Sequence, residues 1–250
     1  MKISIITVAK NSENTIKETF ESVLRQGYPD LDYIVIDGAS TDKTLEITES
    51  YRDKFNGAMR VVSEPDNGIY DAMNKGIALA RGEVIGILNS DDFFTSDDAL
   101  KTIAAEIGTF DALYGDIHFV SRDDLTHSKR YYSSKIFRPW LLRFGFAPAH
   151  PAFFLKKSCY EKFGCYAADL RLSADFDMFA RLFGKHRINA KYVEKDFVTM
   201  RLGGASTQSL AAHLECTGEI VKSLKKLGIY SNSFLCSFRF PIKFFQLFHR

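Results

Sequence analysis

The first 110 residues alternate short apolar runs with stretches in which apolar residues recur every three or four positions. The apolar, β-branched runs predict buried strands at residues 2–9, 31–36, 59–63 and 84–88. Helices are expected to begin at Asn14 or Thr15, within residues 40–42, at residue 69 and at residue 97. Glu18 fits a capping box with Thr15, and Gly27 ends that first helix. Strands alternating with helices predict a Rossmann-like, mostly parallel α/β sheet flanked by helices.

After residue 110 the pattern becomes less regular. We expect a strand at residues 112–120, a helix at 173–183, strands at 188–193 and 197–202, and a late helix carrying Leu210, Leu214, Val221 and Leu224. Residues 125–160 are expected to be rich in loops. The chain contains no internal repeat and no low-complexity linker.

The composition is that of an ordinary soluble globular protein, with 46% hydrophobic and 26% charged residues and a net charge of +2. None of the four cysteines belongs to a C-x-x-C pair, and no histidine cluster completes a zinc pattern, which indicates reduced thiols. The N-terminal apolar stretch is too short for a signal peptide, and no segment approaches the roughly 18 uncharged apolar residues of a membrane span. We therefore expect a cytoplasmic protein, soluble or peripheral to the inner face of the cell membrane.

Polar residues follow each of the four predicted strands. These are the segments 7–11, 37–40, 64–68 and 89–92, and the last reads Asn89-Ser90-Asp91-Asp92. In open parallel sheets, ligands bind beyond the carboxyl ends of the strands. Two alternative roles exist for the last segment. It could cap the helix that follows, although Thr95 and Ser96 already supply caps for that helix, or it could be a solvated acidic loop. Adjacent carboxylates at such an edge favour a divalent cation site for Mg²⁺ or Mn²⁺.

The chain lacks two common phosphate-binding motifs. It matches neither G-x-x-x-x-G-K-[ST] nor, after its first strand, G-x-G-x-x-G. Their absence argues against a P-loop enzyme and against a nicotinamide oxidoreductase.

Four segments together resemble a known family. These are "SIITVAKNSENTIKETFESVLRQGYPDLDYIVIDGASTDKT", "EPDNGIYDAMNKGIALARGEVIGILNSDD", "AHPAFFLKKSCYEKFGCYAADLRLSADFDMFARLFGKH" and "GGAST". In this order and spacing they resemble a family-2 glycosyltransferase of the GT-A fold, similar to bacterial surface-polysaccharide enzymes of the colanic-acid or O-antigen type. The resemblance implies a GT-A domain over residues 1–210, with a nucleotide-sugar half at 1–110 and an acceptor half at 111–210. A helical, basic and aromatic tail would follow at 211–250.

The resemblance also assigns roles at the donor site. Thr7 and Ala9 would border the nucleotide base, and Asp37 would hydrogen-bond it, with uracil as the usual base. The other positions implied to line the nucleotide pocket are Asn67, Asn74, Lys75, Asn89 and Ser90. Asp91, with Asp92, would hold Mn²⁺ or Mg²⁺ on the diphosphate, and this metal would help the leaving group depart.

Two positions depart from the family pattern. Asn89 stands where relatives usually carry Asp, which leaves the metal with less negative charge, although an amide can still contact ribose. Met73 stands where many relatives carry Arg. The cation that assists the diphosphate is then Lys75 or Arg171.

An acidic residue near residue 175 is the expected general base. The resemblance places the family's base at Asp175, with Asp177 as the alternative; two residues apart on a helix, they point to different faces. Asp175 could instead cap the helix, but Ser173 is available for that role. One carboxylate and a metal suit an inverting single displacement.

Two further features have open roles. His150 either contacts the donor or acceptor sugar or serves a structural role. Gly203 and Gly204, before Ser206, form either a loop that closes over the diphosphate or an ordinary turn.

Two other functions compete with an inverting hexosyl transfer to a glycan or lipid-linked acceptor. A nucleotidyltransferase would show a Gly-rich basic loop after the first strand, where this chain has "AKNSENT". A non-catalytic nucleotide-sugar-binding module would be expected to lose Asp91 or Asp175, and the chain keeps both. No nucleic-acid partner is expected.

The second half of the chain carries its positive charge in two stretches. Residues 125–160 contain seven Lys or Arg and residues 220–250 contain six, and neither stretch has an acidic residue. The tail adds aromatic residues: Phe234, Phe238, Phe240, Phe244, Phe245 and Phe248. Such a mixture favours contact with an anionic membrane surface. The alternative is that these rings complete the core or a homodimer interface.

Overall fold

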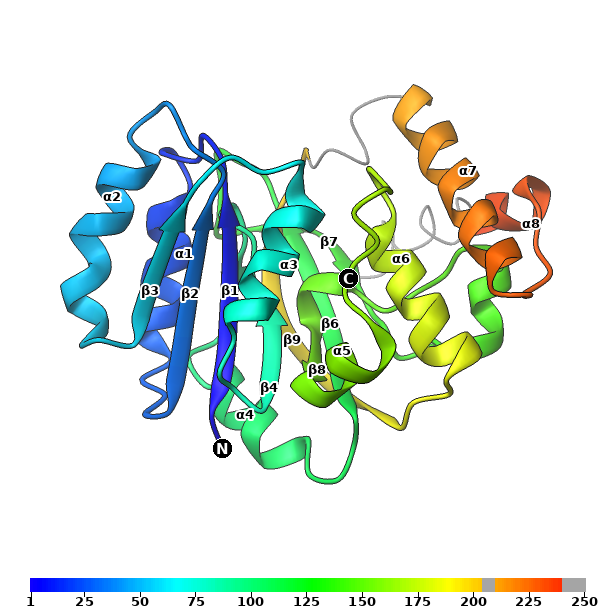
Figure 1. Ribbon diagram of the computed structural model, residues 1–250, viewed down its shortest axis with the longest axis horizontal. Coiled ribbons are helices and arrows are strands. Elements are labelled where there is room, and N and C mark those ends of the chain that lie inside the picture. Colours follow the sequence, from blue (N-terminus) through cyan, green and yellow to red (C-terminus); the bar gives the residue numbers. More distant parts are fainter. Residues whose placement is uncertain (204–209, 240–250) are drawn as a thin grey trace.

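The computed structural model describes residues 1–203 and 210–239. Its sheet contains nine strands in the order β3-β2-β1-β4-β8-β6-β9-β5, with β7 beside β6 (Figure 1). The strands are β1 Ile3–Ala9, β2 Leu31–Asp37, β3 Met59–Ser63, β4 Val84–Ile87, β5 Phe93–Phe94, β6 Ala112–Val120, β7 Ser128–Tyr132, β8 Phe153–Lys156 and β9 Ala190–Arg201. The α-helices are α1 Ile16–Arg25, α2 Thr44–Tyr51, α3 Ile69–Leu79, α4 Ala99–Glu106, α5 Lys157–Phe163, α6 Ala174–Phe179, α7 Leu210–Lys226 and α8 Ser233–Ser237.

The first four strands form the parallel sheet that the sequence predicts. β1 pairs in parallel with β2 and β4, and β2 pairs in parallel with β3. The carboxyl ends of these strands therefore lie at one edge. β8 then joins antiparallel to β4, so the segment that precedes β8 returns to the carboxyl end of β4.

Apolar clusters cover both faces of the sheet. Ile6 and Val8 of β1 belong to the cluster that includes α3 and α6, whereas Ile3 and Ile5 belong to the cluster that includes α1 and α4. Figure 1 accordingly shows α3 in front of β1 and α1 behind the sheet. A Cβ on Gly76 of α3 would lie 2.4 Å from Ile6, so only glycine allows this close helix–sheet contact.

The second half is more ordered than expected. Residues 125–160 contain β7, β8, the start of α5 and two 3₁₀-helices, η2 Pro139–Phe144 and η3 His150–Ala152. The two strands expected at 188–193 and 197–202 form one strand, β9, and the helix expected at 173–183 continues from α6 as a π-helix, Ala180–Lys185. These elements depend on pairing with distant strands such as β6, which local sequence patterns do not specify.

No helix in the described part of the chain is long and apolar enough to cross a membrane. All four cysteines are free thiols.

Candidate active site

The loops that follow β1 and β2 are tied to each other at the carboxyl edge. The Asn11 amide donates to Ser40 Oγ at 2.8 Å, and the Asn11 side-chain oxygen accepts from the Thr41 amide at 2.9 Å. Asn11 and Ala39 both have a positive φ, 51° and 54°, which is uncommon for residues other than glycine. These interactions hold the two loops in a defined shape beside the strand ends.

Asp37, at the end of β2, is fully buried, and its own surroundings satisfy it. Its carboxylate accepts hydrogen bonds from the Ser40 amide at 3.1 Å, from Ser40 Oγ at 2.5 Å and from Ser63 Oγ at 2.6 Å. A Cβ on the next residue, Gly38, would lie 2.1 Å from Asp66 Oδ2, so a larger residue here would displace the Asp66 side chain. These three hydrogen bonds leave one acceptor site, on Oδ1, for a base contact by Asp37.

The side chains of β1 contribute little to this edge. The Thr7 hydroxyl is fully buried and pairs with the Tyr33 hydroxyl at 2.9 Å, inside the cluster that contains α1. Ala9 is also buried, at the end of the strand. Thr7 therefore presents no side-chain group to a nucleotide in this arrangement.

The loop before α3 and the helix itself carry three of the expected residues: Asn67, Asn74 and Lys75. The Asn67 amide donates to Asp71 Oδ2 at 2.9 Å, and Lys75 Nζ donates to the Pro65 carbonyl at 2.7 Å and contacts Glu64 at 2.8 Å. The bond to Glu64 raises the pKa of Lys75, which stays a cation. Asn74 instead uses both atoms of its amide group to bind the backbone of Tyr166, each at 2.9 Å. Its amide group thus joins α3 to the segment before α6.

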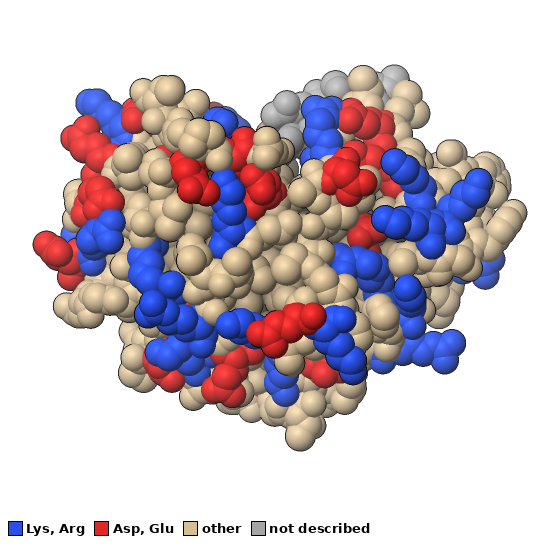
Figure 2. Space-filling view, in the orientation of Figure 1, with Lys and Arg blue, Asp and Glu red and all other residues tan. Residues whose placement is uncertain are grey.

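The remaining candidate residue for the diphosphate is Arg171. Its guanidinium pairs with Glu215 of α7 through Nε at 2.8 Å and through a second nitrogen, and this pairing raises its pKa. Arg171 also lines a pocket between the start of α3 and the segment before α6, formed by residues 67–71 and 168–171. In Figure 2 a notch opens at the top of the molecule, with acidic side chains on both sides of it.

The segment Asn89–Asp92 leaves the end of β4 beside β1. The Ser90 amide donates to the Val8 carbonyl at 3.3 Å, and the Ser90 hydroxyl pairs with Ser12 at 2.8 Å. Asn89 Oδ1 is buried without a hydrogen-bond partner among the described residues. A buried acceptor without a donor is costly unless a ligand supplies one. The orphaned oxygen therefore fits a ligand group such as a ribose hydroxyl or a hydrated cation.

The two carboxylates of this segment differ in environment. Asp91 is half-buried, whereas Asp92 is only 1% exposed and accepts from Asn89 Nδ2 at 3.3 Å. Burial, followed by the charge of Asp91, raises the pKa of Asp92 well above its ordinary value. Asp91 is therefore the more accessible ligand for a cation, and Asp92 would need the cation's charge to stay ionised.

Arg201, which the sequence analysis did not single out, supports this segment from the end of β9. One of its terminal nitrogens donates to the Asp91 carbonyl, and the other lies 3.7 Å from Glu18 of α1. Its guanidinium also lies over the Phe93 ring, 5.2 Å from the centroid. The sequence signal was weak: a single cation at the end of a predicted strand. Its side chain is buried, so it acts by holding the backbone of Asp91 in place.

Asp175 begins α6 opposite the start of α3. The Tyr70 hydroxyl donates to Asp175 Oδ1 at 3.2 Å, and the Phe176 amide donates to the same oxygen at 2.8 Å. Within the residues that the structure describes, Oδ2 has no hydrogen-bond partner. Burial and the charge of Asp175 raise the pKa of Tyr70, so this hydroxyl remains a donor. The arrangement fixes the carboxylate through one oxygen and leaves the other available.

The alternative carboxylate, Asp177, is buried and paired. Its Oδ2 accepts from Arg181 Nε at 2.9 Å, and Arg181 also donates to the backbone carbonyls of Phe163, Gly164 and Cys165. The pair therefore anchors α6 to the end of α5. The expected cap is absent as well, because the Ser173 hydroxyl donates to Glu219 of α7 at 2.7 Å.

His150 lies in η3, which the antiparallel β4–β8 pair brings to the carboxyl end of β4. Its Nε2 is 2.7 Å from the Tyr166 hydroxyl, and the Tyr166 ring stacks on Tyr70 with centroids 5.7 Å apart. Burial lowers the pKa of His150, and the nearby charge of Asp175 opposes that shift. His150 is thus a neutral neighbour of Asp175, linked to it through two tyrosines.

The described residues contain no group of three or more His, Cys, Asp or Glu that could hold a metal by themselves. A site for Mg²⁺ or Mn²⁺ that uses one or two carboxylates plus substrate phosphates does not need such a group. The accessible carboxylate of Asp91 and the orphaned oxygen of Asn89 fit that type of site. Gly203 is described, but Gly204 and Ser206 of the expected closing loop lie outside the described residues.

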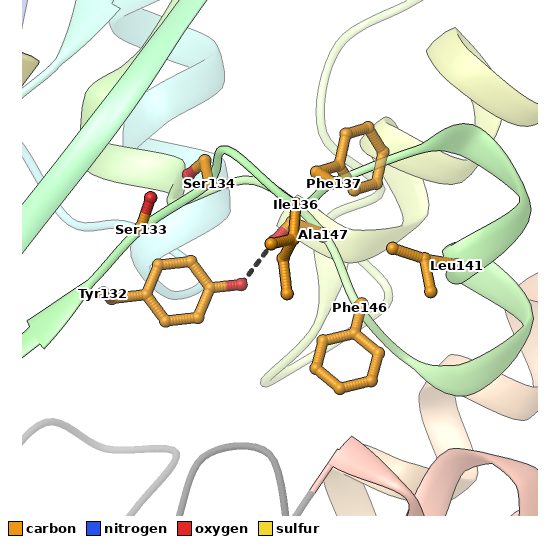
Figure 3. Close-up of a pocket in the computed structure, with 8 residues that line it drawn as sticks. All are labelled: Tyr132, Ser133, Ser134, Ile136, Phe137, Leu141, Phe146 and Ala147. Carbon is orange, nitrogen blue, oxygen red and sulfur yellow. Dashed lines mark hydrogen bonds between the residues drawn. The ribbon is translucent and has the colours of Figure 1, made fainter. Parts of the chain in front are cut away.

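A second pocket is lined by residues between positions 132 and 147 (Figure 3). Ile136, Phe137, Leu141 and Phe146 line it, and the Tyr132 hydroxyl at its side donates to the Ala147 carbonyl at 2.7 Å. Because its lining is mainly apolar and its polar groups are paired, this pocket offers no catalytic chemistry.

Comparison with curated proteins identifies relatives with named activities. The chain is 29% identical over 193 residues to a PGL/p-HBAD biosynthesis glycosyltransferase of Mycobacterium bovis, which covers 76% of this chain and 73% of that protein. It is 35% identical over 109 residues to the poly(ribitol-phosphate) beta-N-acetylglucosaminyltransferase TarS of Staphylococcus aureus, covering 43% of this chain and 19% of TarS.

Solved structures show the same fold. TarS 1–349 in complex with UDP-GlcNAc matches with a TM-score of 0.68 at 19% identity, covering 92% of this chain and 68% of that one. A longer TarS structure matches with a TM-score of 0.67, and this chain spans 41% of it. The mannosyltransferase PcManGT of Pyrobaculum calidifontis, in complex with GDP-Man and Mn²⁺, matches with a TM-score of 0.64 at 18% identity. The match covers 90% of this chain and 63% of PcManGT. The fold is therefore the GT-A fold expected from the sequence.

The sequence signature of the family described as "Glycosyl transferase family 2" matches residues 4–163. This range includes the polar edge of the sheet, from β1 through Asn89–Asp92, and continues through His150 to the end of α5. The chain belongs to glycosyl transferase family 2.

Proposed function

We propose that the protein transfers a sugar from a UDP-sugar to a hydroxyl of a glycan or lipid-linked acceptor, with inversion at the anomeric carbon. The observation that carries this proposal is the hydrogen bonding of the Asp175 carboxylate. One of its oxygens is held by Tyr70 and the Phe176 amide, and the other has no partner in the described chain. A fixed carboxylate with one available oxygen is what a general base requires.

In this mechanism the acceptor hydroxyl attacks the anomeric carbon while the bond from that carbon to the diphosphate oxygen breaks. Asp175 Oδ2 takes the proton, and the nucleoside diphosphate leaves. A retaining double displacement would need a nucleophilic carboxylate close to the base. The nearest candidate in the sequence, Asp177, is paired with Arg181, which supports a single displacement.

The donor half supplies groups for a nucleoside diphosphate. Asp91 and the Asn89 oxygen are the groups that would hold Mn²⁺ or Mg²⁺, and the bound ion would neutralise the leaving diphosphate. Arg201 keeps the Asp91 backbone in position, while Lys75 and Arg171 are the cations beside the α3 pocket. PcManGT was solved with GDP-Man and Mn²⁺ and TarS with UDP-GlcNAc, which supports a metal and a nucleotide-sugar donor here.

A role in bacterial surface-polysaccharide synthesis is consistent with the named relatives, one of which is a poly(ribitol-phosphate) transferase. The direct test is a donor screen by mass spectrometry, in which UDP-sugars and GDP-mannose are incubated with the protein and Mn²⁺. Release of UDP that depends on Mn²⁺ and on Asp175 supports the proposal. Binding of a nucleotide sugar with no turnover under any donor and acceptor would instead support a non-catalytic module.

A further inference from the structure

A row of four aromatic side chains, three of them exposed and Phe144 half-buried, lies at the junction of η2 and α8. We call Trp140, Phe144, Phe234 and Phe238 the aromatic ridge. Their ring centroids are spaced 6.0 Å from Trp140 to Phe144, 6.1 Å from Phe144 to Phe238 and 5.3 Å from Phe238 to Phe234. Trp140 is 61% exposed, Phe234 71% and Phe238 45%. Two segments that are distant in the sequence thus form one continuous apolar surface.

The core does not need these rings. In η2 the side chain of Leu142 is fully buried, and in α8 that of Cys236 is fully buried, so each element already has an inward face. Leu141 of η2 contributes to the apolar pocket of Figure 3. Exposed apolar patches rimmed by polar residues typically mark interaction sites, because leaving them in water is unfavourable.

The charge around the aromatic ridge has one sign. Arg138 precedes Trp140, and Arg143 lies between Trp140 and Phe144. Lys222, Lys225 and Lys226 lie on the part of α7 that leads to α8, and all five cations are exposed. Residues 125–160 and 220–250 contain no acidic residue. Lys135 differs, because it pairs with Glu194 at 2.8 Å. Figure 2 shows mostly blue side chains over the side of the molecule that carries α8.

We propose that the aromatic ridge inserts into the interface of an anionic lipid bilayer, with these five cations against the lipid headgroups. Aromatic rings insert at the bilayer interface, and each nearby cation adds attraction to anionic lipid. A second protein would need acidic surface complementary to the cations, and a second copy of this ridge would bring like charges together.

The position of the aromatic ridge relative to the site suits a lipid-linked acceptor; this point rests on the proposed function. α7 contacts the catalytic segment through Glu215 and Glu219, which pair with Arg171 and Ser173. From Glu219, α7 continues for seven residues to Lys226, about 10 Å at 1.5 Å per residue, and then leads into α8. One helix therefore connects the segment that contains Asp175 with the aromatic ridge.

The chain provides its own probe, because Trp140 is its single tryptophan. We expect the full-length protein to show a blue shift of tryptophan emission with vesicles of phosphatidylcholine containing about one-third phosphatidylglycerol, and quenching by brominated lipid. Phosphatidylcholine vesicles alone should give little shift. The anionic vesicles should also give little shift in about 1 M NaCl, because the electrostatic screening length falls to about 3 Å.

A variant pair tests the rings themselves. Phe234→Ser combined with Phe238→Ser should lower the vesicle partition coefficient at least about tenfold in flotation. The control Leu214→Ser removes a side chain that is 67% exposed on α7 but lies outside the aromatic ridge, and it should float like the native protein. Because all three positions are exposed, the variants should keep the native melting temperature.

Three results would overturn the proposal. Flotation without any change at Trp140 would assign binding to another part of the chain. A blue shift that grows with protein concentration in the absence of lipid would assign the aromatic ridge to self-association. Failure of the native protein to float at low salt would exclude the membrane. UDP binding by calorimetry, measured without vesicles, is independent of all three and reports on the proposed function.

Discussion

Replacing Asp175 with asparagine isolates proton transfer from the other contributions to the proposed reaction. The amide keeps the shape of the carboxyl group, and its oxygen can still accept from Tyr70 and from the Phe176 amide. Its nitrogen cannot take a proton. We expect kcat to fall by roughly 10²–10⁴, the range for loss of general-base catalysis. This corresponds to about 2.7–5.4 kcal/mol of activation free energy.

The same change should leave stability and donor binding nearly intact. Asp175 is half-buried and both of its hydrogen bonds can be kept, so the free energy of unfolding should change by less than about 1 kcal/mol. Calorimetry with UDP and Mn²⁺ should give an unchanged Kd, because in the proposed mechanism Asp175 acts on the acceptor.

Asp177 is the matched control on the same helix. Its side chain and that of Arg181 are 8% and 17% exposed, so they form a largely buried pair. Removing one charge from a buried pair costs about 3–5 kcal/mol. Asp177→Ala should lower the free energy of unfolding by about 3 kcal/mol, the lower end of this range, because Arg181 keeps its hydrogen bonds to three backbone carbonyls. For a chain of this size the melting temperature should then fall by about 6–12 °C.

The assay combines single-turnover transfer from a radiolabelled donor with thermal melts of each variant. We expect Asp175→Asn to lose turnover at native stability, and Asp177→Ala to keep turnover at temperatures where it is folded. The reasoning is refuted if folded Asp177→Ala loses turnover by more than about 10²-fold while Asp175→Asn stays active.

Three further changes test the donor edge and the neighbouring histidine. Asp91→Ala should abolish metal-dependent UDP binding in calorimetry, and unchanged binding with Mn²⁺ would contradict its role as the cation ligand. Arg201→Met should raise the Kd for UDP with Mn²⁺ by about tenfold, as expected for a residue that positions a metal ligand; a lower melting temperature with unchanged Kd would assign Arg201 to stability alone. Burial holds the pKa of His150 below the ordinary value of about 6.5, so its contribution to stability is present above that pH and is lost as the pH falls below it. His150→Gln should therefore flatten the decline of the unfolding free energy as the pH falls below about 6.5 in urea titrations, and an unchanged slope would show that His150 does not contribute to this decline.

Several parts of the fold could be read directly from local sequence. The strands at residues 59–63 and 112–120 have the bounds that their apolar runs predict. The parallel pairing of the first four strands, and the polar edge that follows from it, also agree with the sequence. Apolar periodicity and β-branched composition are local properties, so they can be read from the sequence. Strands that are buried on both faces are typical of a parallel sheet covered by helices on each side.

Other local signals were overridden by contacts between distant segments. The Thr15 side chain does not cap α1, and Glu18, expected to complete a capping box, lies near Arg201 instead. Ser173, expected to cap the helix that contains Asp175, bonds to Glu219. Glu18 and Ser173 each have a partner from a remote element, which a sequence pattern confined to one helix cannot include, whereas the Thr15 hydroxyl bonds locally to the Ser12 carbonyl.

In the candidate site, too, some features follow from local sequence and others depend on contacts between distant segments. The sequence alone indicated an acidic donor edge and left two carboxylates, Asp175 and Asp177, as candidate bases. The tertiary structure distinguishes their surroundings, because two helical positions about 200° apart face different neighbours: Tyr70 from α3 on one side and Arg181 on the other. The pattern of apolar and polar residues determined which segments form strands and helices, and which acidic residues follow the strands at the edge of the sheet. Which charges are paired and which remain free was decided only when strands and helices far apart in the chain came into contact.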